Sequence, residues 1–181
     1  MKFLKIFIII VFTTLLNNCS VLKTYKPPPQ TAKYIDEDKF IGKWYEIAGI
    51  PGLRSSGCTC TSSTYLKSKT KNKFTVLNRC FLSSKHYWDN GKGTANILPN
   101  TNNTKLKVTF LWPFYFDMWI LYASDNYQTS IIGSPNYKNL YISSRKPKIS
   151  EKEFDKLIKI AKQKGYDTSL LRKTKQNCHN S

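Results

Sequence analysis

The feature that most constrains this chain is a series of short strand-like segments between residues 40 and 145. Each segment is rich in Val, Ile, Thr, Tyr, Phe or Trp, and polar turn residues separate it from the next one. In residues 105–111, Leu106, Val108 and Phe110 alternate with polar residues, which is the period of a strand with one buried face. We expect eight strands, at residues 44–50, 59–66, 74–81, 92–98, 105–111, 117–123, 129–132 and 140–144.

The period changes after the last of these strands. Four apolar residues then fall at helical spacing: Phe154, Leu157, Ile158 and Ala161. Ser150 and Glu153 form a capping box in front of them, and Gly165 stands where a helix ends in a left-handed conformation. Many short strands in series predict a sandwich or an up-and-down barrel. With one amphipathic helix packed outside, the pattern favours an all-β, eight-stranded antiparallel barrel, which is wide enough for one small ligand.

The two ends of the strand series carry the residues of a known signature. Gly42-Lys43-Trp44 opens the first strand, and Arg145 follows the last strand about 100 residues later. This pair resembles the lipocalin family, in which the tryptophan plugs the closed end of the barrel and the arginine lies across its indole face. Residues 76–80, 110–120 and 164–167 are similar to segments of the bacterial outer-membrane lipocalins (the Blc group), which are related to apolipoprotein D.

Two stretches depart from the family pattern. Lipocalins usually carry Asp-Tyr just before the last strand, whereas this chain has Asn-Tyr-Lys-Asn at residues 136–139, with Asn139 where an aromatic residue is expected. The segment Phe116-Asp117-Met118 is bulkier than the glycine-rich loop of typical members. We therefore expect the mouth of the barrel to differ, and the resemblance does not carry over the identity of a ligand.

The N-terminal residues predict export. Lys2 and Lys5 precede an apolar run over residues 6–16, which is shorter than the roughly 20 residues of a spanning helix and is typical of a signal peptide. The run ends at Asn18-Cys19, which resembles a bacterial lipobox, although Asn18 stands where a small residue is usual. The alternative is a soluble periplasmic or secreted protein in which Cys19 is incidental.

These features divide the chain into three parts. We expect residues 1–18 to be a lipoprotein signal peptide, and residues 19–33 to be a lipidated Cys19 followed by a proline-rich tether. Palmitate is among the acyl groups expected on Cys19. Residues 34–181 then form the barrel, its helix and a disulfide-tied tail. The expected location is the bacterial outer membrane.

The charge of the chain is strongly positive. The formal net charge is +18, of which about +16 remains once Lys2 and Lys5 leave with the signal peptide. Such a surface attracts anionic headgroups with a strength that falls as salt rises. The alternative is compositional drift, because the chain is rich in Lys, Asn, Ile and Tyr together and its lysines are scattered. An exported chain without a nucleic-acid motif is not expected to bind nucleic acid.

Four cysteines remain when Cys19 is set aside, and an even number in an exported chain predicts two disulfides. Cys58 and Cys60 share one face of a strand, and Cys80 lies on its hairpin partner. Either of the first two can therefore face Cys80, which leaves the other to bind Cys178. The resemblance to bacterial lipocalins and to apolipoprotein D favours Cys58–Cys80 with Cys60–Cys178. A zinc site that includes His86 is a weaker alternative, because Cys-x-Cys matches no usual zinc spacing.

No constellation for catalysis is visible. The chain has two histidines, His86 and His179, and neither has an evident carboxylate partner. Asp36, Glu37 and Asp38 read as a solvated turn before the first strand. We expect no enzyme activity, no cofactor and no metal, although a few lipocalins are enzymes.

The expected function is binding of one apolar ligand, a fatty acid or a lysophospholipid, for lipid storage or transport in the cell envelope. The predicted ligand contacts are one acid and six aromatic residues: Glu46, Trp88, Trp112, Phe114, Trp119, Tyr122 and Tyr141. The alternative is an interaction scaffold with a filled barrel, whose exposed patch would contain Trp112, Phe116, Met118 and Trp119. Whether the barrel forms a homodimer stays open.

Overall fold

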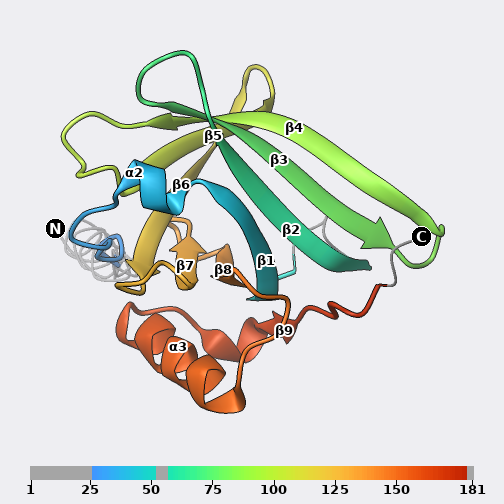
Figure 1. Ribbon diagram of the computed structural model, residues 1–181. Helices are drawn as coiled ribbons and strands as arrows, with labels where there is room; N and C mark the ends of the chain where they lie inside the picture. The colour runs from blue at the N-terminus through green and yellow to red at the C-terminus, as the bar shows by residue number, and fades with distance from the viewer. Residues whose placement is uncertain (1–25, 52–56, 179–181) are drawn as a thin grey trace, which may run out of the picture.

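The computed structural model describes residues 26–51 and 57–178 (Figure 1). Its eight main strands run in an antiparallel up-and-down order, and β1 pairs with both β8 and β2, so the sheet closes into a barrel. Their bounds are β1 (Gly42–Gly49), β2 (Cys58–Lys67), β3 (Lys73–Leu82), β4 (Tyr87–Ile97), β5 (Lys105–Leu111), β6 (Phe114–Ala123), β7 (Thr129–Gly133) and β8 (Leu140–Ser144). The predicted barrel is confirmed.

Two strands begin earlier than the sequence pattern predicts. β4 begins at Tyr87 rather than at residue 92, because the ladder with β3 runs without interruption from the pair of Lys73 and Asn96 to the pair of Leu82 and Tyr87. β6 begins at Phe114 rather than at residue 117. The beginning of β4 contains the polar run Asp89-Asn90-Gly91, whose residue types do not predict a strand. This run is extended because it pairs with β3.

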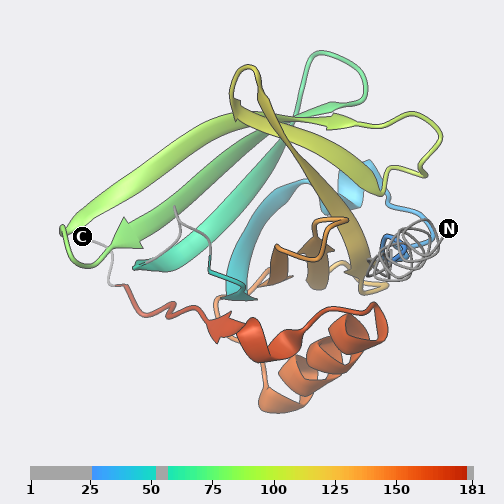
Figure 2. The ribbon, with the colours of Figure 1, turned by 180° about the vertical axis from the view of Figure 1, so that it is seen from behind.

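The predicted helix is α3 (Glu151–Gln163), which packs on the outside of the barrel in both views (Figures 1 and 2). The Ser150 hydroxyl accepts a hydrogen bond from the Glu153 backbone N–H, as the capping box predicts. The Glu153 carboxylate does not return the bond to Ser150 in the described contacts; it accepts one from the Thr129 hydroxyl at 3.2 Å. Gly165 ends the helix with φ +90°, as expected.

Three short elements were not expected. Residues 36–38 are not a solvated turn: Asp36 caps α2 (Glu37–Phe40), its side chain accepting bonds from the N–H groups of Asp38 and Lys39. After α3 come a 3-10 turn (Thr168–Leu170) and β9 (Arg172–Lys173), which pairs with the end of β1.

Among the described residues, no helix is both long and apolar enough to cross a membrane.

Buried side chains form two clusters, one inside the barrel and one under the helix. The interior cluster joins α2 to every strand from β1 to β7: its members include Phe40, Trp44, Tyr65, Phe74, Val76, Ala95, Ile97, Leu106, Val108, Ile120 and Ile132. The helix cluster packs α3 against the outer face of β1, β6, β7 and β8, through Ile47, Leu121, Ile131, Ile142, Leu157, Ala161 and Tyr166. The closed end of the barrel is therefore filled by packed side chains.

The expected N-terminal tether lies only partly within the described residues. Residues 26–33 lie against the barrel: the Ala32 N–H donates to the Ile120 carbonyl at 3.0 Å, and Pro29 is buried. The predicted signal peptide, residues 1–18, and the predicted lipidation site Cys19 lie outside the described residues.

Candidate functional site

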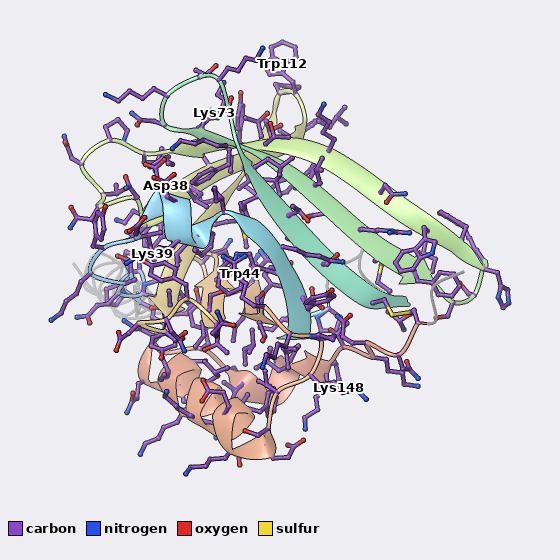
Figure 3. All side chains as sticks on the ribbon, viewed as in Figure 1. Asp38, Lys39, Trp44, Lys73, Trp112 and Lys148 are labelled. Carbon is purple, nitrogen blue, oxygen red and sulfur yellow. A yellow bond between two sulfur atoms is a disulfide. The ribbon has the colours of Figure 1, made fainter. Side chains whose placement is uncertain are left out.

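The closed end of the barrel is built on Trp44, which lies near the centre of the molecule in Figure 3. Its indole N–H donates to the Phe40 carbonyl at 2.8 Å, and the Arg145 guanidinium lies 3.8 Å from its ring centroid. The predicted stacking of Arg145 on Trp44 is confirmed. Arg145 also donates to five backbone carbonyls, those of Lys39, Phe40, Ile41, Lys43 and Tyr127.

Gly42 of the signature is required by the same arrangement. Its φ is +100°, which L side chains rarely adopt, and a Cβ there would lie 3.1 Å from Arg145 Nη1. Burial lowers the pKa of the Arg145 guanidinium, which still remains charged at neutral pH because the ordinary pKa of arginine is so high. One arginine thus connects α2, the start of β1 and the end of β8.

Strand register identifies the residues that face the lumen just above Trp44. Trp44 pairs with Ser63, Ser63 with Asn78, and Asn78 with Gly91. Paired residues of antiparallel strands point to the same face, so all of them face the interior with Trp44. The Asn78 Oδ1 atom is buried and has no hydrogen-bond partner among the described residues. This layer of the lumen is therefore polar and offers a hydrogen-bond acceptor.

Glu46 is a buried acidic group that faces the lumen. It lies two residues after Trp44 on the same strand, and its Oε1 accepts a hydrogen bond of 2.6 Å from the Thr174 hydroxyl. Burial raises the pKa of the Glu46 carboxyl, and the bond from Thr174 opposes this in part. The carboxyl is thus shifted toward its neutral form, in which it can donate as well as accept a hydrogen bond.

Tyr141 converges with Glu46 above Gly49. A Cβ on Gly49 would lie 3.1 Å from the Tyr141 ring and 3.2 Å from Glu46 Oε1, so the absent side chain leaves room for both. Burial, and then the nearby charge of Glu46, raise the pKa of Tyr141. Burial, with Tyr141 adding to it, raises the pKa of Tyr65 to about 12. Both tyrosines stay neutral hydrogen-bonding groups at physiological pH.

The C-terminal tail completes the wall of the barrel where β1 and β2 separate. These strands pair only from Gly42 to Tyr45 of β1. Beyond that point the Thr174 N–H donates to the Ile47 carbonyl at 2.9 Å. The Gln176 side-chain amide donates 2.8 Å bonds both to the Glu46 carbonyl on β1 and to the Thr61 carbonyl on β2. The tail therefore bridges the gap between β1 and β2, and no local sequence pattern predicts this role.

Both disulfides have the pairing that the family resemblance favours. Cys58 is bonded to Cys80, and Cys60 to Cys178. The alternative pairing of Cys60 with Cys80 and Cys58 with Cys178 is wrong. All four sulfur atoms are in disulfides, and within residues 26–51 and 57–178 no group of three or more His, Cys, Asp or Glu is arranged to hold a metal ion.

Three of the predicted ligand contacts lie on the outer face of the barrel. Trp88 pairs with Phe81 and carries the Arg79 guanidinium 3.8 Å from its ring centroid; this face of β3 is the exposed one. Trp119 and Tyr122 pack against the helix cluster. The register turns them outward, a detail that residue type does not reveal. Their placement does not fit the expectation that they line the lumen.

The remaining predicted contacts lie inside the barrel or at its rim. Glu46 and Tyr141 face the lumen together, as described above. Trp112 and Phe114 lie at the tip of the β5–β6 hairpin, where 77 % and 63 % of their surface is exposed. The structure thus divides the seven predicted residues into a luminal pair, two residues at the hairpin tip, and three residues outside.

Phe110 faces the lumen, as its place on the buried face of the predicted strand implies, but it was not among the predicted ligand contacts. Its ring lies over Gly91 and Gly93 of the neighbouring strand, and a Cβ on Gly93 would come within 2.7 Å of that ring and 2.5 Å of the Thr109 carbonyl. Two glycines one residue apart inside a strand are a signal for such a close approach. That signal was hidden because the predicted strand began only at Lys92.

Comparisons with known proteins agree with this architecture. The lipocalin-like domain family matches residues 35–176. The outer membrane lipoprotein Blc of Vibrio cholerae is 28% identical over 168 residues, which cover 90% of this chain and 94% of that protein. Temperature-induced lipocalin-1 of Arabidopsis thaliana is 32% identical over 168 residues, covering 85% and 86% of the two chains.

Solved structures share the fold at lower identity. Insecticyanin from the tobacco hornworm Manduca sexta superposes with a TM-score of 0.65 at 20% identity, over 83% of this chain and 84% of its own. Lobster apocrustacyanin A1 gives a TM-score of 0.64 at 17% identity, over 87% and 94%. The barrel, the Trp44–Arg145 stack and the family match together lead to one conclusion: this chain belongs to the lipocalin family.

Proposed function

We propose that this lipocalin binds the acyl chain of a fatty acid or a lysophospholipid in the open half of its barrel. Family membership supports binding of a small hydrophobic ligand. The observation that carries the proposal is the mixed lining of the lumen, in which Phe110 and Met118 pack on the interior cluster while Glu46, Asn78 and Tyr141 supply polar atoms on the same inner face. An amphipathic molecule matches this combination, since its chain is driven inward by about 0.8 kcal/mol per buried methylene.

The polar layer restricts the headgroup chemistry. An ionised Glu46 repels a carboxylate, whereas a neutral Glu46 can donate a hydrogen bond to it. Because burial raises the pKa of Glu46, acid favours binding of a free fatty acid inside the lumen. A lysophospholipid can keep its phosphate outside, where the positive charge of the chain is complementary.

The proposed site in the cell follows from the relatives and the N-terminal residues. The similar Blc proteins are outer membrane lipoproteins by name. We propose the same location for this chain, held by a lipid on Cys19, with a role in lipid storage or transport in the cell envelope. Two disulfides are consistent with an oxidising compartment. Mass spectrometry of the N-terminal peptide from membranes tests this, and an unmodified Cys19 there would contradict it.

A paired substitution on β4 tests the ligand site. Gly91 faces the lumen, and a Cβ there meets only ordinary contacts of 3.6 Å or more, so Gly91→Phe puts a ring into the ligand space without a backbone clash. Lys92→Phe places the same ring on the outer face of the same strand and is the matched control. Native mass spectrometry of detergent-free protein, with organic extraction, should find an acyl lipid on the wild type and on Lys92→Phe. Equal lipid occupancy in Gly91→Phe would contradict a luminal site.

A further inference from the structure

The tip of the β5–β6 hairpin carries more large exposed apolar side chains than any other part of the described chain. We call Leu111, Trp112, Phe114, Tyr115 and Phe116 the aromatic tip. Between 46% and 77% of each side chain is exposed, and together they are five of the ten large exposed apolar side chains among the described residues. A contiguous apolar patch of this kind marks an interaction site on a protein surface.

The aromatic tip is apolar on both faces of the hairpin. Phe116 pairs with Val108, and Val108 is buried in the interior cluster, so Phe116 shares the inner face. Tyr115, the next residue along β6, points to the opposite face. A protein partner of ordinary shape covers one face of a hairpin and leaves the other in water. The apolar part of a lipid bilayer is fluid and can surround both faces of the hairpin at once.

The charges around the aromatic tip favour a lipid surface as its partner. Residues 108–116 contain no charged side chain, although 22% of the chain is charged. Behind the tip, the exposed Lys107 on β5 is paired with the exposed Asp117 on β6, and the exposed Lys92 lies on the neighbouring strand β4. An uncharged aromatic tip followed by charged residues, two lysines and one aspartate, matches the arrangement at a bilayer interface, where Trp and Tyr occupy the headgroup level and lysines contact anionic lipids.

The hairpin is placed so that its tip can reach a flat surface. In both ribbon views the β5–β6 hairpin projects away from α3, and Trp112 lies at the outer limit of the molecule (Figures 1, 2 and 3). We propose that the aromatic tip is a membrane-docking element that enters the headgroup and acyl boundary of an anionic bilayer. The inner face of the hairpin then continues from Phe116 in the bilayer to Met118 in the barrel. Docking of this kind is independent of the lipid anchor on Cys19 and of the luminal ligand.

Fluorescence of a single residue tests the docking in the full chain. The protein is added to vesicles of phosphatidylethanolamine and phosphatidylglycerol whose acyl chains carry bromine, and the Trp112 emission is taken as wild type minus Trp112→Phe. We expect this emission to shift to the blue and to be quenched by bromine. The emission of Trp88, obtained in the same way with Trp88→Phe, should not be quenched, because Trp88 lies under Arg79 on the outer face.

Two outcomes of this measurement overturn the proposal. If the protein is on the vesicles and the Trp112 emission stays that of a water-exposed indole, the tip does not enter the bilayer. If the Trp112 emission is already shifted to the blue, relative to a water-exposed indole, in the absence of vesicles, the tip is covered by a second copy of the chain instead.

A pair of double variants measures the contribution to binding. Trp112→Ser with Phe114→Ser removes the two most exposed aromatics of the tip, while Tyr34→Ser with Leu170→Ser removes side chains that are 61% and 49% exposed elsewhere. Both pairs are placed in a Cys19→Ser chain, so that any contribution of the N-terminal residues is the same. The tip pair should weaken partitioning into the anionic vesicles at least about tenfold, from the area that each ring buries. Equal loss in both pairs, or equal binding to phosphatidylcholine vesicles, contradicts the proposal.

Discussion

The guanidinium of Arg145 lies on one aromatic ring and donates to five backbone carbonyls, all at the closed end of the barrel. Substitution by alanine leaves those carbonyls without their donor. We expect Arg145→Ala to lower the free energy of unfolding by at least about 2 kcal/mol, as for hydrogen bonds to a charged group. Urea denaturation measures it. Arg172→Ala is the control, since Arg172 donates only to nearby carbonyls of its own turn.

Substitution of Gly42 and of Gly57 by alanine distinguishes the cost of backbone strain from the cost of a steric clash. Both glycines have positive φ, +100° and +81°, but a Cβ meets Arg145 Nη1 at 3.1 Å in Gly42 and no described residue within 4 Å in Gly57. Each change to alanine should cost on the order of 1–3 kcal/mol of stability from the unfavourable φ. Gly42→Ala should cost more, because it also displaces Arg145. Equal losses in urea denaturation would show that the contact with Arg145 carries no energetic weight.

Glu46 makes stability depend on pH with a definite sign. Its pKa is raised by folding, from a usual value of 4.5, so the proton binds the native state more tightly than the unfolded state. The stabilising contribution is full below pH 4.5 and is lost as pH rises through the raised pKa. Glu46→Gln removes this titration and keeps an acceptor for Thr174. The variant should therefore gain stability relative to wild type as pH rises, which urea denaturation across pH 4 to 8 would show. A constant difference would contradict a raised pKa.

At the scale of elements, the C-terminal tail acts as a part of the barrel wall. The Cys60–Cys178 disulfide joins residues 118 apart, whereas Cys58–Cys80 joins residues 22 apart. The chain-entropy model gives about 5 kcal/mol for the longer loop and about 3 kcal/mol for the shorter one. Replacing both cysteines of each pair by serine, in separate variants, should follow this order in urea denaturation.

Hydrogen exchange distinguishes the two disulfide variants further. The Thr174 N–H, bonded to Ile47, should exchange much faster in the Cys60→Ser/Cys178→Ser variant, because the tail then loses its tether. The same amide should stay protected in the Cys58→Ser/Cys80→Ser variant. Protection in both would mean that the hydrogen bonds of Gln176 hold the tail without the disulfide.

Most elements follow from local patterns. β5 (Lys105–Leu111) and β8 (Leu140–Ser144) have the predicted bounds, and α3 has the predicted cap at Ser150 and end at Gly165. The beginning of β4 was missed because Asp89, Asn90 and Gly91 are extended only through their pairing with β3. Such pairing is a long-range contact, and no window of sequence contains it.

At the scale of the whole molecule, ligand binding and folding are linked. A lipid that binds only the closed barrel should stabilise it by about 2.7 kcal/mol when its free concentration is a hundredfold above Kd. Thermal unfolding with added lysophospholipid measures this stabilisation in wild type and Lys92→Phe. Gly91→Phe should show little of it, because the added ring occupies the ligand space. Unchanged melting of the wild type with every fatty acid and lysophospholipid would favour the scaffold hypothesis.

The candidate site was predictable only in part, for a geometric reason. Of the residues chosen by type, Glu46 and Tyr141 face the lumen, whereas Trp88, Trp119 and Tyr122 lie outside. In β6 the register shifts between Ile120 and Tyr122, so alternation along the strand changes phase there. A shift of one residue exchanges the inner and outer faces, and aromatic residues are equally suited to a lumen and to the surface under α3.

The sequence by itself determined the number and order of the eight barrel strands, the helix with its cap and its terminal glycine, and the pair of Trp44 and Arg145 that identifies the family. These features rest on local periodicity or on motifs of a few residues. Only the tertiary structure decided which aromatics face the lumen, how the tail joins β1 to β2 through Gln176, and that the aromatic tip is apolar on both faces. Those properties depend on strand register and barrel closure, which arise between segments far apart in the chain.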